Sequence, residues 1–176
     1  MLREIGDRVT LALTLTNLGI TIGNQGDYSA ARAHSEEGLA ISREIGFRKG
    51  VDIALYNFGS VSEKLGKYVE AQAYFRQSLV ISRGLGDRRS AAEHLESFAS
   101  LSLKQGKPGD AVMLWGAAGA LRAKIGAPLS PIGREQYDQG VAAARRGLGE
   151  EAFAAAWVMG QAMTLDEATD LALQSS

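Results

Sequence analysis

The sequence predicts an all-α protein, a right-handed superhelical solenoid of antiparallel helix pairs followed by a C-terminal helical cap. Three observations predict this fold. Marker residues recur every 40 positions, apolar residues inside each unit follow the spacing of a helix face, and glycines interrupt the helical pattern at regular points. Because one helix pair cannot bury both of its faces, successive pairs must stack on one another.

Several independent series of residues carry the 40-residue period. Glycines are expected at helix ends, while small residues and alanines recur inside the helices. The members are Ile5-Gly6, Ile45-Gly46, Leu85-Gly86 and Ile125-Gly126, then Gly26, Gly66 and Gly106, then Gly19, Gly59 and Ala99, and finally Ala31, Ala71 and Ala111. Because these series share one period, we place the repeats in residues 1–126, with units at about 8–46, 47–86 and 87–126.

The second unit illustrates the two helices of each repeat. Apolar and small residues at helical spacing predict a first helix from about Arg48 to Leu65. Gly66 is expected to end that helix in the left-handed conformation that glycine adopts easily. A second helix then follows and ends at Gly84 and Gly86.

Helix starts are predicted from short polar side chains that accept hydrogen bonds from free backbone amides. Asp7 and Asp87 are expected to cap the helices that follow them, whereas Phe47 takes this position in the second unit and leaves that helix without a cap. Residues 2–6 match the end of a unit's second helix. This match predicts that the chain is a piece of a longer array.

Residue size along the helices predicts how they pack. Small residues midway along the first helices and early in the second helices let paired helices approach to about 8 Å. Aromatic residues are expected to fill the space between neighbouring pairs, namely Phe58, Phe75, Phe98 and Trp115.

Residues 127–176 depart from the period and are predicted to form the cap. Ser130 followed by Pro131 is typical of a helix start. A short apolar helix is expected next. Thr164 and Glu167 have the spacing of a capping box, which predicts the start of the last helix.

Composition argues against several function classes. The chain has 19 Lys and Arg against 20 Asp and Glu, a net charge of −1, which does not favour general nucleic-acid or membrane-surface binding. Arg88-Arg89 and Arg145-Arg146 are only dipeptides, so no direct contact with nucleic acid is expected. The absence of cysteine excludes disulfides and thiolate sites. Without a signal peptide or a membrane-spanning stretch, we expect a cytoplasmic protein.

The sequence offers no set of residues suited to catalysis. The two histidines, His34 and His94, are far apart in the sequence and are expected at the surface rather than in a metal site. No phosphate-binding loop, dinucleotide-binding loop or nucleophile motif is present. We therefore expect no enzymatic activity, no catalytic residue, no metal and no cofactor.

The repeat pattern resembles the tetratricopeptide repeat. A small residue, an alanine and an aromatic residue stand in the family's order at Gly59, Ala71 and Phe75, and again at Ala99, Ala111 and Trp115, while the first unit has Ser35 in place of the aromatic residue. The period of 40 is longer than usual and is similar to the variant found in kinesin light chains and in bacterial regulators of the MalT type. The resemblance implies a protein- or peptide-binding module whose first helices line a concave surface.

The C-terminal half resembles the C-terminal region of large bacterial regulators. The similar segments begin at Trp115, Ile125, Leu148 and Met163. The regulators include LuxR-type transcription factors, AfsR-like proteins and proteins with cyclase domains. The resemblance implies a sensory or regulatory part of such a protein, with an output domain and a nucleotide-binding domain upstream.

Candidate binding residues lie on the predicted concave face. In similar long-period repeats asparagines at the positions of Asn17 and Asn57 contact peptide, and an asparagine amide matches the polar groups of an extended peptide backbone. The alternative is that both asparagines fix the stacking of helices. Tyr56 is the expected anchor, since tyrosine provides contact area at low entropic cost, although it could equally pack on a neighbouring helix. The remaining candidates are Ser60, Lys64, Glu96, Ser97 and Lys104.

The expected partner is a protein, a peptide or an upstream domain of the same polypeptide. One alternative is a structural element for homo-oligomerisation, through the first edge of the array or the apolar segment Ala152–Met159. Another is a small-molecule effector pocket between the repeats and the cap.

Overall fold

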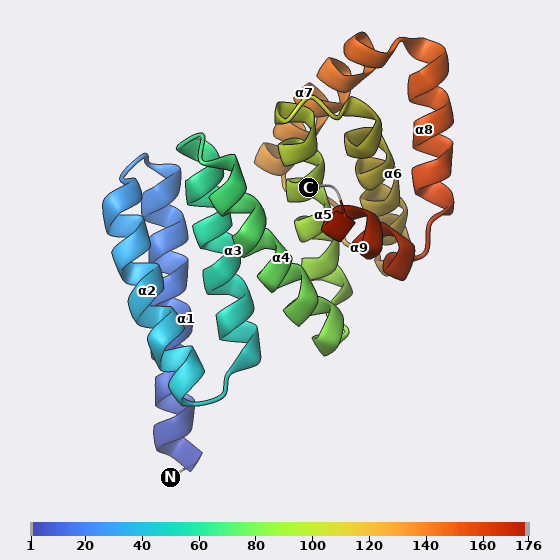
Figure 1. Ribbon diagram of the computed structural model, residues 1–176. Helices are drawn as coiled ribbons and strands as arrows, with labels where there is room; N and C mark the ends of the chain where they lie inside the picture. The colour runs from blue at the N-terminus through green and yellow to red at the C-terminus, as the bar shows by residue number, and fades with distance from the viewer. Residues whose placement is uncertain (1, 175–176) are drawn as a thin grey trace. The chain divides into compact units, whose positions relative to one another are not determined.

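The computed structural model describes residues 2–174, which form nine helices and no strand (Figure 1). The helices are α1 (Leu2–Asn24), α2 (Tyr28–Glu44), α3 (Arg48–Lys64), α4 (Tyr68–Leu85), α5 (Arg88–Lys104), α6 (Pro108–Ile125), α7 (Pro131–Leu148), α8 (Glu150–Ala162) and α9 (Leu165–Gln174). This confirms the all-helical repeat. The helices form two compact units, Met1–Leu85 and Gly86–Ser176, while the predicted boundary near residue 126 remains a prediction.

Glycines with positive φ recur every 20 residues and follow the helices α1 to α6. They are Gly26, Gly46, Gly66, Gly86, Gly106 and Gly126, with φ between 63° and 96°. A Cβ atom at any of them would meet nothing within 4 Å, so the constraint is the backbone conformation rather than space. Only glycine adopts this region without strain, which explains why the two glycine series persist.

The N-terminal helix differs from the prediction at Asp7. This residue lies inside the continuous helix α1, so its predicted capping role is wrong. The chain passes through Gly6 without a turn, since a glycine inside a helix costs only about 1 kcal/mol. Arg8 pairs with Glu44 at the end of α2, so residues 2–7 extend past that end (Figure 1).

The other predicted helix starts are confirmed. The Asp87 carboxylate accepts the Ser90 amide at 3.0 Å, and the Ser130 hydroxyl accepts the Gly133 amide at 3.2 Å. Phe47 provides no side-chain cap, as expected. Asp27 provides a cap that was not predicted, because its carboxylate accepts the Ala30 amide at 3.0 Å at the start of α2.

The first unit packs α1 against α2, α3 against α4, and α2 against α3. The predicted role of small residues holds here for Gly19, and Gly38, late in α2, is a further close approach that was not predicted. A Cβ at Gly19 would lie 2.8 Å from the Ala31 carbonyl oxygen, and one at Gly38 would lie 2.9 Å from that of Ala12. Real Cβ atoms do not approach backbone oxygens so closely. These two glycines therefore allow the close packing of α1 on α2.

The second unit is organised around α6, which contacts α5, α7, α8 and α9. Helices α6 and α8 cross very closely. A Cβ at Gly160 would lie 2.8 Å from both the carbonyl carbon and the Cα of Met113. On the opposite helix, a Cβ at Gly116 would lie 2.8 Å from the Trp157 carbonyl oxygen. Each glycine thus makes room for the backbone of the other helix.

The capping box of α9 makes the start of this helix sensitive to pH. The Glu167 carboxylate accepts the Thr164 amide at 2.7 Å and the Thr164 hydroxyl at 2.8 Å, and these bonds lower the pKa of Glu167. A carboxylate whose pKa is lowered in the folded state stabilises that state above its ordinary pKa, about 4.3, and loses this contribution as pH falls through the lowered value.

We expect the Thr164 amide resonance to titrate with a midpoint below about 4.3 in NMR spectra. The variant Glu167→Gln keeps an acceptor oxygen but cannot titrate, so this transition should disappear from its spectra. A midpoint at or above the ordinary glutamate value in the parent protein would contradict the assignment.

Candidate docking surfaces

The first helices of the first unit, α1 and α3, contact each other in matching register. The Lys64 ammonium donates a hydrogen bond to the Asn24 side-chain oxygen at 2.9 Å, and these two residues are 40 positions apart. Equivalent residues of the two repeats therefore lie side by side. A row of partly exposed side chains follows from this register: Leu13 and Ile20 on α1, and Ile53 and Ser60 on α3.

Tyr56 and Ser60 lie one turn apart on α3. The Tyr56 ring packs against the buried Phe75 ring of α4, with centroids 5.6 Å apart, and Tyr56 keeps part of its surface exposed. The Ser60 hydroxyl donates to the Tyr56 carbonyl oxygen at 3.1 Å. The hydroxyl oxygen retains its lone pairs, so Ser60 can still accept a hydrogen bond from a partner.

Asn57 occupies a different environment from the one predicted for a peptide contact. It is buried, and its amide donates a short hydrogen bond to the Ser35 hydroxyl of α2. A Cβ at Gly19 would lie 3.2 Å from the same amide nitrogen, so Asn57 fills a junction of α1, α2 and α3. This geometry supports the alternative role of fixing helix stacking.

Asn17 stands 40 residues before Asn57 but is exposed on α1. Its side chain therefore has an amide group available to a partner, whereas the amide of Asn57 is already bonded inside the core.

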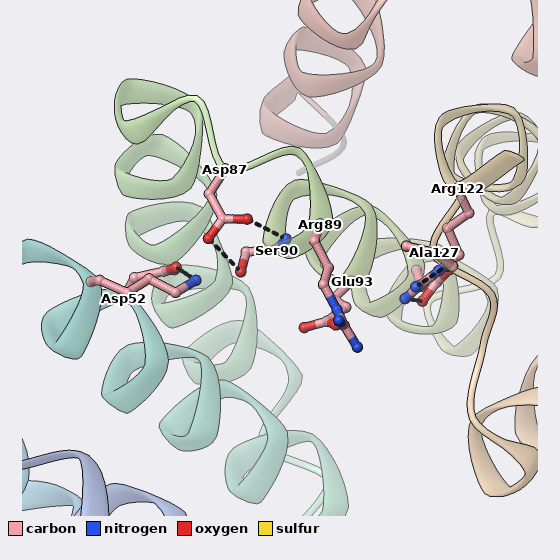
Figure 2. Close-up of polar contacts among 9 residues, drawn as sticks. Asp52, Asp87, Arg89, Ser90, Glu93, Arg122 and Ala127 are labelled. Carbon is pink, nitrogen blue, oxygen red and sulfur yellow. Dashed lines mark hydrogen bonds and ion pairs between the residues drawn. The ribbon is translucent and has the colours of Figure 1, made fainter. Parts of the chain in front are cut away.

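In the second unit the candidate Glu96 is engaged in a partly buried ion pair. The Arg122 guanidinium donates to the two carboxylate oxygens of Glu96 at 2.5 and 2.9 Å, and to the Ala127 carbonyl oxygen at 3.1 Å (Figure 2). The pair joins α5 to α6 and holds the segment that follows α6. Arg122 was not predicted as a partner, since this residue is 26 positions from Glu96 and no short motif links them.

The other two candidates of the second unit are on α5. The Ser97 hydroxyl donates to the Glu93 carbonyl oxygen at 3.2 Å, and the residue is partly exposed. Lys104 is exposed in the last turn of the helix. Arg89 and Glu93 form an ion pair at 3.6 Å on the same helix (Figure 2). This face of α5 is therefore rich in charges.

Tyr137 closes the region between α6 and α7. Burial raises the pKa of Tyr137 to about 12, with a further contribution from the negative charge of Glu96. The phenol therefore stays protonated at neutral pH, and it donates a hydrogen bond to the Trp115 carbonyl oxygen at 3.3 Å. The two rings pack edge to face with centroids 6.1 Å apart. This contact is structural.

A buried carboxylate in the first unit also escaped the sequence analysis. Asp52 on α3 is fully buried, and it accepts a hydrogen bond from the Ser78 hydroxyl at 2.6 Å. It also accepts one from the Lys49 ammonium at 3.1 Å (Figure 2). A buried charge is tolerated when it is paired and hydrogen-bonded. The cluster joins α3 to α4.

Residues 2–174 bring together few side chains suited to metal binding. No group of three His, Asp or Glu residues in that range could hold a metal ion. The prediction that both histidines lie at the surface is wrong for His94, which is 2% exposed in α5, whereas His34 is partly exposed. The apolar side of a helix can accommodate an imidazole ring, so the sequence around an isolated histidine does not show whether the residue is buried.

In the described part of the chain, no helix is long and apolar enough to cross a membrane.

Comparison with known families supports the repeat. Residues 11–45, which span most of α1 and α2, match the family model of the tetratricopeptide repeat. No curated protein matches the chain.

Proposed function

Since residues 11–45 of this all-helical chain form a tetratricopeptide repeat, a type of repeat that generally mediates interactions between proteins, we propose that the first unit binds an extended peptide segment of a partner. The proposed surface is the inner row, defined as Leu13, Ile20, Ile53, Tyr56, Ser60 and Lys64 on α1 and α3.

One observation carries this proposal: the matching register of α1 and α3, held by Lys64 and Asn24, aligns the partly exposed side chains of the inner row. The row offers apolar contact at Leu13, Ile20 and Ile53, and an acceptor at Ser60. Lys64 has three donor hydrogens, so its bond to Asn24 leaves two for a partner. The partner best suited to this surface is a segment with apolar side chains and a carboxylate near Lys64.

The binding module fits a regulatory role in a larger protein. We propose that it belongs to the sensory part of a bacterial transcriptional or signalling regulator, as the C-terminal resemblance implies. In that setting the peptide could come from a separate protein or from an upstream domain of the same polypeptide. Ser97 and Lys104, on the charged face of α5, are proposed as a separate contact surface of the second unit.

A selection from a random peptide display library tests the proposal. The triple variant Tyr56→Phe, Ser60→Ala and Lys64→Ala removes the polar groups of the inner row without emptying the core. We expect selected peptides to carry an acidic residue beside apolar residues. They should bind the variant at least about tenfold more weakly, as three hydrogen-bonding groups, one of them charged, are lost.

The matched control removes three exposed residues from the second helices, through Glu37→Ala, Arg43→Ala and Gln77→Ala. This control should bind the peptides as the parent does. Asn57 stays unchanged in both variants because it is bonded inside the core. Equal binding by both triple variants, or a failure to enrich any peptide, would reject the inner row as the binding surface.

A further inference from the structure

The outward face of α1 carries apolar side chains that the described part of the chain does not cover. Leu11 is 48% exposed and Leu18 is 42% exposed. They lie two helical turns apart, and the exposed residues Thr14, Asn17 and Thr21 lie between or beside them at helical spacing. We call these five residues the α1 edge.

The same positions on α3 are covered by another helix. The residues 40 positions later are Val51, Ala54, Asn57, Phe58 and Val61. Of these, Ala54 and Phe58 form a buried cluster with Leu39 of α2, and Val51 packs against this cluster. Asn57 donates to Ser35 of α2. Within this chain, therefore, the face that corresponds to the α1 edge docks a second helix whose serine and leucine are four residues apart.

The threonines of the α1 edge need no polar partner. The Thr14 hydroxyl donates to the Thr10 carbonyl oxygen at 2.8 Å, and the Thr21 hydroxyl to the Asn17 carbonyl oxygen at 2.9 Å. These intrahelical bonds satisfy the hydroxyl protons, so burial of the threonines would leave none of these protons without an acceptor. Asn17 alone presents amide donors that a covering helix would have to meet.

We infer that the α1 edge docks an amphipathic helix with the pattern of α2, in which a serine faces Asn17 and a leucine four residues later packs between Leu11 and Leu18. The α1 edge is equivalent, by the period of 40, to the face of α3 that docks α2 in the same chain, and this equivalence indicates its occupant. A second copy of α1 would bring no serine to Asn17. The inference rests on residues outside the inner row and does not depend on the proposed peptide function.

A synthetic peptide that copies residues 27–46 provides the probe, with the full chain as receptor. A labelled peptide is titrated with the protein, and binding is followed by fluorescence anisotropy. Binding is expected to be weak, since an isolated helix of this length is only marginally formed. Leu18→Glu should weaken it at least about tenfold, because a charge would replace a buried leucine.

The serine–asparagine contact is tested by a double-mutant cycle. Asn17→Ala in the protein and Ser35→Ala in the peptide should each weaken binding several-fold, and the two changes together should cost little more than either one. The control Val69→Glu alters an exposed apolar residue of α4, 83% exposed, and should leave the affinity unchanged. If circular dichroism shows that the Leu18→Glu variant is unfolded, Thr14→Arg is used in its place. This substitution also puts a charge on the α1 edge and should weaken binding in the same way.

Three results would overturn the inference. The first is the absence of peptide binding to the parent protein. The second is binding that both edge variants retain, which would place the peptide elsewhere, for instance in exchange with the protein's own α2. The third is self-association of the parent in sedimentation experiments that Leu18→Glu abolishes, which would identify a second copy as the occupant.

Discussion

Replacing Gly160 with alanine is expected to lower the free energy of unfolding of the second unit by about 3 kcal/mol, at the upper end of the usual cost of overpacking. The added methyl group would collide with the backbone of Met113 on α6, where a Cβ would lie 2.8 Å from both the Cα and the carbonyl carbon. Backbone atoms cannot rotate away as a flexible side chain can, so α6 and α8 would have to separate.

The measurement is urea denaturation followed by tryptophan fluorescence. Both tryptophans, Trp115 and Trp157, lie in the second unit, so the signal reports that unit. Gly147→Ala is the matched control, because a Cβ at Gly147, inside α7, would meet nothing within 4 Å. It should stabilise the helix by up to about 1 kcal/mol. A Gly160→Ala variant as stable as the parent would show that α6 and α8 do not pack as closely as in this structure.

Breaking the Glu96–Arg122 pair is expected to cost about 3 kcal/mol whichever partner is truncated, because the remaining charge would be left largely buried without its counterion. The side chains of Arg122 and Glu96 are 10% and 16% exposed, so water replaces the lost partner only in part. Replacing both residues, through Glu96→Leu and Arg122→Met, removes both charges and should cost less than either truncation to alanine.

Tryptophan fluorescence in urea also measures these variants. Arg89→Ala, which breaks an exposed ion pair on α5, serves as the control and should change stability by well under 1 kcal/mol. A double replacement as costly as the sum of the single truncations would contradict the coupling.

Much of the fold could be predicted because its signals are local. A glycine that must adopt positive φ and an aspartate that caps a helix act within a few residues, so Gly66 and Asp87 were identified correctly. The same local pattern gives a wrong prediction at Asp7, which does not cap a helix. Its sequence context matches Asp87, but Gly6 lies within one long helix and makes no turn. The repeat pattern alone does not distinguish these two outcomes.

The candidate site was harder to predict because side-chain partners come from distant parts of the chain. The period of 40 identifies which positions repeat, but it does not reveal that Asn57 reaches Ser35 or that Glu96 reaches Arg122. Gly160 was missed as a packing residue for a similar reason. Its role depends on how closely α6 and α8 cross, and this distance is set by tertiary packing rather than by any local pattern.

The buried polar partners also bear on how a chain of similar units avoids pairing its helices in the wrong order. If α3 packed on α2 as it does on α4, Asp52 would face Gly38 where Ser78 now stands. Likewise, if α5 packed on α4 as it does on α6, Glu96 would meet Ser82 in place of Arg122. The first exchange would leave the buried Asp52 carboxylate without its hydrogen bond from Ser78, and the second would leave Glu96 without its counterion. Both exchanges are therefore penalised, so these polar contacts favour the correct order of the helices.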